Sequence, residues 1–219
     1  MTEKKKGIWW KYSLLLVVLI AISPVIHFVN QARRGHPLDI NYFWSELSPL
    51  ALFGQGLYNG NGGKDWKIGQ SKLNLLTANE ARSRDQLNAF ALELVNRDRT
   101  LNQTGKLTLD SLLTETAQRH AEDMSQRNYF NHVTPEGKNP RDRFLASGGS
   151  KLVAVGENIS QSGNKGASFT YGIAEELQRG WMYSNGHREN LLTKKYKKFG
   201  YGIATSPNGK LYAVQMFTD

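Results

Sequence analysis

The chain has 219 residues, of which 39% are hydrophobic and 11% aromatic, and it contains no cysteine. This length and composition favour one folded domain with extensions over a disordered chain. The lack of cysteine excludes a disulfide framework, an iron–sulfur cluster, a cysteine-based zinc site and a thiol nucleophile. The formal net charge of +9 raises the question of nucleic-acid binding. The sequence has no pattern typical of a DNA-reading helix, an RNA-stacking sheet or a zinc finger, so we expect no nucleic-acid partner.

An apolar run near the N-terminus predicts a membrane segment. The run extends from Tyr12 to Val29, after three lysines at positions 4–6. A helix that crosses a bilayer needs about 20 apolar residues, and the two tryptophans ahead of the run lie where an aromatic belt is expected. No good small-x-small cleavage site follows. We therefore expect residues 1–34 to form an uncleaved signal anchor, with a cleaved signal peptide as the alternative. The N-terminal lysines place the rest of the chain on the extracytoplasmic side.

Residues 35–82 differ in composition from the segments on both sides. Aromatic clusters alternate with proline and glycine breaks, and "YNGNGGKDW" is typical of a flexible turn or linker. Two interpretations stay open for this linker. It is either a tether that packs loosely against the domain, or an interfacial segment whose aromatic residues at positions 42–44 lie among lipid headgroups. At its end, Thr77 with Glu80 three residues later predicts a helix cap.

Residues 83–219 have the periodicity of one α+β domain. Apolar spacing predicts an amphipathic helix over 82–99 and a second helix that Asp110 or Ser111 caps and that ends near Asn128. A short helix over 141–146 follows the loop "HVTPEGKN". Further on, "KLVAVGENIS" predicts a strand that opens into a polar loop, and a third helix should end at Asn185-Gly186. The last residues alternate around "SPNGK", which predicts an antiparallel hairpin.

Four chemically capable side chains lie at the ends or on the inner stripes of these elements. They are His120 and His132 on and after the second helix, Glu157 in "VGENIS" and His187 after the third helix. Two histidines and a carboxylate from three loops can converge into a cleft that holds Zn²⁺ or another divalent cation. Each residue also has a structural interpretation. His120 would be a core residue, the loop histidines would form local hydrogen bonds, and Glu157 would accept backbone amide hydrogen bonds to hold its loop.

Several segments appear in the order and spacing of one known family. These segments, "LVNRDR", "AQRHAEDMSQRNYFNHVTPEGKNPRDR", "VGENIS", "WMYSNGHRENLL" and "YKKFGYGIA…YAVQMF", resemble the CAP superfamily of cysteine-rich secretory proteins, antigen five and plant pathogenesis-related proteins. The likeness is to its cysteine-free bacterial branch and spans about residues 87–219. It implies an α–β–α sandwich with a small antiparallel sheet and an open cleft, here preceded by the transmembrane helix. By motif, His132 and His187 correspond to the two cleft histidines and Glu157 to the carboxylate of the "GEN" motif.

The sequence departs from the family pattern at one cleft position. Ser184 stands where eukaryotic members carry a further glutamate, so the implied cleft has one carboxylate fewer. Glu175, Glu176 or Glu189 are the candidates to replace it. The expected metal ligands are then His132 and His187, with water or a carboxylate completing the shell, and no other cofactor is expected.

Two functions of different classes remain open. The first is a membrane-anchored extracytoplasmic module that binds a lipid, glycan or peptide between His132, Glu157, His187 and Ser184. The second is a metal-assisted hydrolase, such as a peptidase, in which Glu157 is the general base. A Ser184–His187 nucleophile pair is disfavoured because no third group is evident that would position the histidine. The resemblance favours the binding module.

Overall fold

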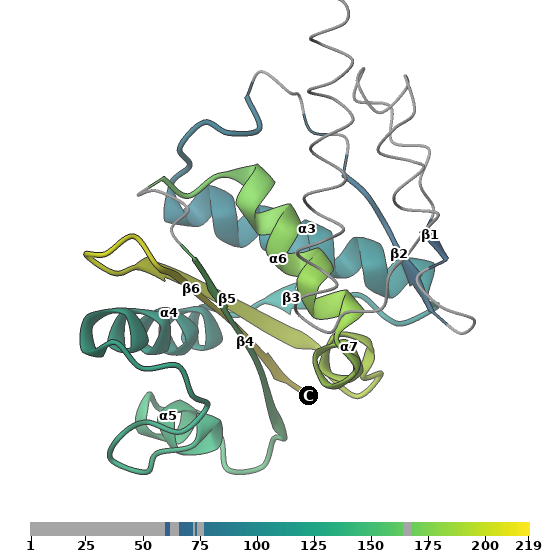
Figure 1. The fold of residues 1–219 in the computed structure, drawn as a ribbon. Helices are drawn as coiled ribbons and strands as arrows, with labels where there is room; N and C mark the ends of the chain where they lie inside the picture. The colour runs from purple at the N-terminus through teal and green to yellow at the C-terminus, as the bar shows by residue number, and fades with distance from the viewer. Residues whose placement is uncertain (1–59, 62–65, 72, 74–76, 164–167) are drawn as a thin grey trace, which may run out of the picture.

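The computed structural model describes one α+β domain together with part of the segment that precedes it (Figure 1). The described residues are 60–61, 66–71, 73, 77–163 and 168–219. The expected anchor, residues 1–34, and most of the expected linker lie outside these residues. Within the described part of the chain, no helix has both the length and the apolar character needed to cross a membrane.

A four-stranded sheet forms the middle layer of the domain, with the strand order β3-β5-β6-β4. In that order the strands are β3 (Thr108–Leu109), β5 (Lys198–Thr205), β6 (Leu211–Thr218) and β4 (Val155–Ser162). The predicted hairpin is confirmed as β5 and β6, and β6 also pairs antiparallel with the whole of β4. The short strand β3 pairs parallel with β5. The sheet is therefore mixed, and the prediction of a purely antiparallel sheet is wrong for this pair.

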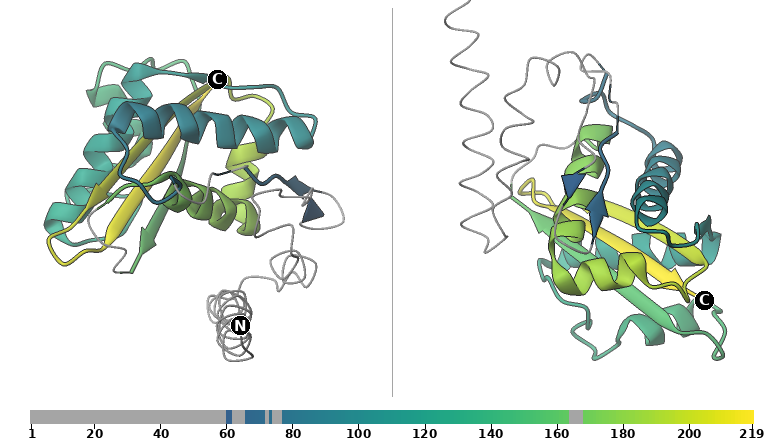
Figure 2. Two further views of the ribbon diagram at one scale, coloured as in Figure 1. Left: turned by 90° about the horizontal axis from the view of Figure 1, so that it is seen from above. Right: turned by 90° about the vertical axis from the view of Figure 1, so that its right-hand side faces the viewer.

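Helices cover both faces of the sheet, as the two views of Figure 2 make plain. Helices α3 (Arg84–Leu101) and α6 (Tyr171–Tyr183) lie on one face, and α4 (Ser111–Arg127) lies on the other (Figure 1). The short helix α5 (Pro140–Ala146) packs on the side of α4, and α7 (Asn185–Leu192) follows α6. Each face has its own apolar cluster, one between the sheet and α3 with α6, the other between the sheet and α4 with α5. Three layers result, so the α–β–α arrangement that the resemblance implies is present.

Two glycines of β5 let α4 pack directly on the sheet. A Cβ added at Gly200 would lie 2.2 Å from the backbone of Leu113, and one added at Gly202 would lie 2.3 Å from the backbone nitrogen of Gln118. Real Cβ atoms do not approach other atoms so closely. The alternation of glycine in "FGYGIA" therefore creates a flat strip on which the helix backbone rests.

The starts of the first two domain helices follow local capping chemistry. Ser83 caps α3 in a capping box with Gln86, so the predicted cap at Thr77 is wrong, and Thr77 instead belongs to a preceding turn. Asp110 caps α4, because its Oδ1 accepts a hydrogen bond of 3.0 Å from the backbone nitrogen of Leu113. That helix ends at Asn128, as the sequence predicts, and the structure adds that Asn128 has the left-handed conformation.

Two element boundaries in the second half of the domain differ from the predictions. Glu157 lies inside β4 and not in a polar loop after it. The third helix, α6, ends at Tyr183, and Ser184 is extended (φ −93°, ψ 123°). The Asn185-Gly186 pair then opens the new helix α7 where the sequence predicts a stop. Tertiary packing overrides the turn signal here, because α7 buries Leu191 in the core.

The described part of the linker packs against the domain. Residues 60–61 form β1 (Gly60–Asn61), which pairs antiparallel with β2 (Lys67–Ile68). Strand β2 lies along α3, and its residue Ile68 belongs to the apolar cluster shared by α3, α6 and α7. The segment around β2 is therefore an integral part of the folded domain.

Candidate functional site

The buried carboxylate of Glu157 is the centre of the candidate site. Strand β4 directs this side chain towards α4 and α5, and only 1% of it is exposed. Its Oε1 lies 2.8 Å from His132 Nδ1, and its Oε2 accepts a hydrogen bond of 2.5 Å from Arg143 Nη2. His132 and Glu157 therefore lie side by side in the structure, although they are 25 positions apart in the chain.

The loop after α4 carries His132, and Arg143 of α5 holds that loop in place. Besides binding the carboxylate, Arg143 donates from Nη1 to the carbonyl oxygens of His132 (2.6 Å) and Lys138 (3.0 Å). A guanidinium group presents several donors in a fixed plane, which allows one side chain to make all three contacts. Sequence reasoning did not identify Arg143, because its role depends on contacts that no local pattern announces.

The contact between His132 and Glu157 determines which ring nitrogen of His132 is available to a ligand. An ionised carboxylate accepts hydrogen bonds only, so the Nδ1 atom of His132 donates a proton to it. In the neutral ring Nε2 then carries a lone pair and can accept a hydrogen bond or bind a metal ion. The His132 side chain is 46% exposed, so this nitrogen belongs to a solvent-accessible group.

His120 lies behind this pair as a core residue. Its side chain is buried in the inner stripe of α4, and its Nε2 lies 3.1 Å from the carbonyl oxygen of Asn131. Burial lowers the pKa of His120 to about 4, an effect that outweighs the opposing influence of Glu157. At neutral pH the ring is therefore uncharged. The structural interpretation of His120 is the one that its environment supports.

The partly exposed residue His187 comes from α7, which lies along β4, the last strand in the order of the described sheet. The side chain of Asn190 donates to the carbonyl oxygen of Glu157 (3.0 Å) and to Oδ1 of Asn158 (2.9 Å). In return, Nδ2 of Asn158 donates to the carbonyl oxygen of His187 (3.1 Å). The backbone of His187 is thus bonded to the residue that follows Glu157. The prediction that the His187 ring shares one cleft with His132 stays a prediction.

Other candidates from the sequence have different outcomes. Ser184 joins α6 to α7, and its hydroxyl makes no capping hydrogen bond to α7. Glu175 binds Arg97 through both of its oxygens, at 2.7 and 2.8 Å, so its carboxylate is engaged in an ion pair between α6 and α3. Among the described residues, no group of three or more histidine, aspartate or glutamate side chains could hold a metal ion. A metal bound by His132 and His187 alone stays a prediction.

Similarities in sequence relate the chain to known proteins. A family model described as the cysteine-rich secretory protein family, CAP, matches residues 92–217. The chain is 33% identical over 115 residues to YkwD of Bacillus subtilis (strain 168), which covers 52% of this chain and 41% of that protein. The chain is also 34% identical over 112 residues to the membrane protein YlbC of the same organism. That match covers 51% of this chain and 30% of YlbC. The matches span less than half the length of these relatives.

The fold comparison agrees with the sequence match. An outer surface protein from Borrelia burgdorferi superimposes with a TM-score of 0.54 at 14% identity, covering 64% of this chain and 97% of that one. At this identity the likeness concerns the fold alone. The family model, by contrast, matches more than half of the chain and includes His132, Glu157 and His187. The chain belongs to the cysteine-rich secretory protein (CAP) family.

Proposed function

We propose that this protein is a membrane-anchored, extracytoplasmic CAP domain that binds its ligand without catalysis, at His132 and the adjoining part of β4. The observation that supports this proposal is the engagement of both carboxylate oxygens of Glu157. A general base needs an oxygen within reach of the proton that it removes. Here one oxygen accepts from the Arg143 guanidinium and the other from the His132 imidazole. Glu157 is thus suited to orient His132 and hold its loop.

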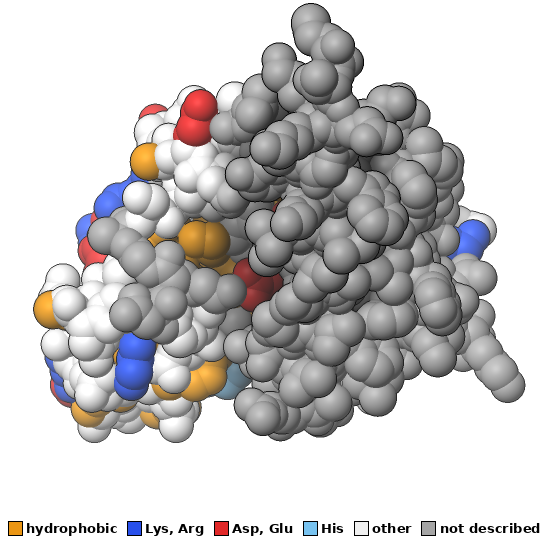
Figure 3. Space-filling view, turned by 45° about the horizontal axis from the view of Figure 1, so that its top comes forward, with side chains coloured by type: hydrophobic (Ala, Val, Ile, Leu, Met, Phe, Trp, Pro, Cys, Tyr) orange, Lys and Arg blue, Asp and Glu red, His pale blue; other side chains and the backbone are white. Residues whose placement is uncertain are grey.

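The surroundings of His132 favour an amphiphilic ligand such as a lipid, over a glycan or a soluble peptide. Phe130 and Val133 flank His132 in the same loop, and they are 44% and 41% exposed. Together with the exposed ring of His132, these two side chains can offer an apolar and a polar contact to one ligand. Figure 3 shows one face of the molecule, on which apolar, basic, acidic and histidine side chains are all exposed.

Binding is tested with the full-length chain in nanodiscs. The probes are a short-chain phospholipid below its critical micelle concentration, an oligosaccharide and a peptide pool, with empty nanodiscs as background. We expect the lipid to bind, and Phe130→Ala and His132→Ala each to weaken that binding about tenfold, the loss of roughly 1.4 kcal/mol. Leu109→Ala is the matched control, because Leu109 is also 44% exposed but lies in β3 at the other edge of the sheet. Equal binding by all variants, or no binding of the lipid, would contradict the proposal.

The membrane location has its own support and its own test. The apolar run from Tyr12 to Val29 fits an anchor, and the relative YlbC is named a membrane protein. We expect the chain to stay in the membrane fraction after a carbonate wash and to lose its domain to an external protease in intact cells. A mature protein that begins after residue 23 and washes free would contradict the anchor.

A metal-assisted hydrolase is the second candidate, and one observation favours it. A carboxylate bonded to one nitrogen of a histidine, with the other nitrogen accessible, is how proteins commonly orient a metal-binding histidine. His132 and Glu157 have this arrangement. Calorimetric titration with Zn²⁺ should then show binding that is lost in the His132→Ala/His187→Ala double variant. Equal uptake by both proteins would exclude this metal site. Turnover of a peptide or ester library by the wild type, lost in a Glu157→Gln variant that is still folded under the assay conditions, would establish the hydrolase in place of the binding module.

A further inference from the structure

The residues Trp66–Ser71, here called the strap, precede the part of the chain that the family model matches. We propose that the strap positions α7, and with it His187, by two routes: a contact of Trp66 with Arg188, and a chain of buried polar side chains that begins at Gly69. Trp66 and Asp98 are then positioning residues for the candidate site. This inference deepens the proposed function and rests on it only in taking His187 as part of that site.

The first route is a direct contact between Trp66 and α7. The guanidinium carbon of Arg188 lies 4.2 Å from the centroid of the Trp66 ring, which is the geometry of a cation–π contact. The same guanidinium donates to the carbonyl oxygen of Met182 (2.8 Å) and to Oδ1 of Asn185 (2.6 Å). Arg188 therefore joins the strap to the last turn of α6 and the first residue of α7. It is also the direct neighbour of His187.

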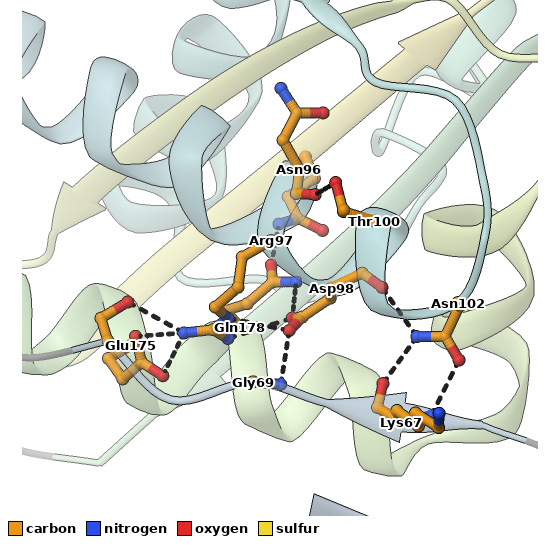
Figure 4. A network of polar contacts seen from close by, with 11 residues as sticks. Lys67, Gly69, Asn96, Arg97, Asp98, Thr100, Asn102, Glu175 and Gln178 are labelled. Atoms are coloured by element: carbon orange, nitrogen blue, oxygen red, sulfur yellow. Dashed lines mark hydrogen bonds and ion pairs between the residues drawn. The ribbon is translucent and has the colours of Figure 1, made fainter. Parts of the chain in front are cut away.

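The strap itself is fixed along the C-terminal half of α3 (Figure 4). The backbone of Lys67 exchanges two hydrogen bonds with the Asn102 side chain, at 2.8 and 2.6 Å. The backbone nitrogen of Gly69 donates to Oδ1 of Asp98 at 2.9 Å, and Arg97 donates to the Ser71 hydroxyl at 2.9 Å. Three of these bonds involve the backbone of the strap and one its Ser71 hydroxyl, so the strap has one register on the helix.

The second route starts at Asp98 and passes through the core. Gln178 of α6 donates to Oδ2 of Asp98 (2.8 Å), and Gln215 of β6 donates to Oε1 of Gln178 (2.9 Å). Asn158 of β4 donates to Oε1 of Gln215 (3.1 Å) and to the carbonyl oxygen of His187 (3.1 Å). All four side chains are buried. A continuous series of hydrogen bonds thus links an amide of the strap to the backbone of His187.

The buried side-chain amides of this series fix one another's orientation, because none of them can rotate without breaking hydrogen bonds to the others. The side-chain oxygens of Gln178 and Gln215 accept while their nitrogens donate, so a flip of either would leave buried polar atoms unpaired. Such an unpaired buried group is destabilising, because it has lost its hydrogen bonds to water without gaining others. Moreover, α7 has only eight residues and no side-chain N-cap, and a helix this short is not stable alone. Its placement therefore depends on the contacts that reach it from β4, α6, the strap and Arg99 of α3.

The test measures the chemical reactivity of individual histidines in the full-length chain. Diethyl pyrocarbonate modifies neutral imidazoles, and mass spectrometry gives a separate rate for His132 and His187. We expect Trp66→Ala to change the rate at His187 at least threefold and to leave the rate at His132 unchanged. Trp66→Phe keeps an aromatic face for Arg188 and should restore the wild-type rate. Lys67→Ala is the control within the strap, because the exposed residue Lys67 binds Asn102 through its backbone.

Two further variants keep the test decisive if Trp66→Ala does not fold. Trp66→Leu keeps an apolar side chain without an aromatic face, and it should behave as Trp66→Ala does. Asp98→Asn removes the charge at the start of the second route. Asp98 lies at the opposite end of the hydrogen-bond series from His187, and its replacement should also change the rate at His187. An unchanged rate at His187 in folded Trp66→Leu and Asp98→Asn would overturn the inference, as would equal changes at both histidines. No ligand is needed, so this result is independent of whether the binding proposal holds.

Discussion

His132 and Glu157 form a pair in which an exposed imidazole is held by a buried carboxylate, with 2.8 Å between Nδ1 and Oε1. The second oxygen of the carboxylate binds Arg143, which also binds the carbonyl oxygen of His132. One acidic side chain therefore fixes both the ring and the loop that carries it. The rigidity of this arrangement is a condition for any function that the ring performs.

Replacement of Glu157 by glutamine should destabilise the domain. Glu157→Gln keeps the shape but leaves the largely buried guanidinium of Arg143 without its anionic partner, which typically costs about 3–5 kcal/mol. We expect a loss of this size in the free energy of unfolding from urea titration. Glu115→Gln is the control, because Glu115 and Arg119 form an exposed pair worth about 0.3–0.5 kcal/mol. Equal losses in both variants would contradict the structural role of Glu157.

Acid should weaken the fold through His120. Burial lowers the pKa of His120 from 6.5 to about 4 in the folded protein, so between these values the unfolded chain binds the proton more readily. Stability therefore falls as the pH drops from 6.5 towards 4, by ~3 kcal/mol in total for this residue. Urea titrations at pH 7, 5.5 and 4.5 should show this slope in the wild type and a smaller one in His120→Gln. Identical slopes would show that His120 does not stay neutral in the fold.

The buried residue Arg99 should be hard to replace, even by lysine. It donates to the carbonyl oxygens of Gly105, Leu191, Thr193 and Tyr196 at 2.6, 2.7, 3.0 and 3.3 Å. Burial lowers its pKa to about 10, so it remains protonated at neutral pH. A lysine cannot reach all four oxygens, and we expect Arg99→Lys to cost about 2–4 kcal/mol in the free energy of unfolding.

Arg84→Lys on the same helix is the control for this prediction. More than half of the Arg84 side chain is exposed, and it pairs with the exposed carboxylate of Glu122. Its replacement should change the free energy of unfolding by less than about 0.5 kcal/mol. If both lysine variants unfold at the same urea concentration, the carbonyl contacts of Arg99 do not stabilise the fold as we infer.

A single methyl group at Gly200 should force α4 away from the sheet. The Cβ of Gly200→Ala would overlap the backbone at Leu113, and overpacking of this kind typically costs about 1–3 kcal/mol or more. Gly180→Ala is the matched control, because a Cβ at Gly180 meets nothing within 4 Å and alanine favours the helix by about 1 kcal/mol. Thermal unfolding should therefore shift in opposite directions for the two variants. A shift in the same direction would contradict the close packing of α4 on β5.

Local chemistry explains which elements the sequence could predict. The helix α4, its cap at Asp110 and the β5–β6 hairpin depend on periodicity and on turn residues within a few positions. The same rules failed at α7, where Asn185-Gly186 normally ends a helix. Distant partners decide that case: Arg99 binds the carbonyl oxygen of Leu191, and Asn190 binds β4. No window of sequence around Asn185 contains these partners.

Part of the candidate site could be predicted from sequence motifs, and the rest depends on contacts between distant residues. His132 and Glu157 could be brought together by motif, while Arg143, which binds both, has no local signature in "NPRDRF". The polar chain through Gln178 and Gln215 did leave a signal in the sequence. Gln215 is a lone polar residue in the otherwise apolar stretch "YAVQMF", and a buried amide in such a strand needs a partner. That signal predicts a partner but cannot name it.

The position of β4 at the edge of the described sheet has a consequence for how copies of this chain meet one another. An uncovered strand edge presents unpaired carbonyl and amide groups to which a strand from another molecule can add. In β4 two successive outward carbonyls are already taken, Glu157 by Asn190 and Ile159 by the Trp181 indole at 3.2 Å. These contacts from α6 and α7 leave fewer carbonyl groups of β4 to which a strand of another molecule could bind. Any change that lifts α7 from β4 uncovers a template for aggregation.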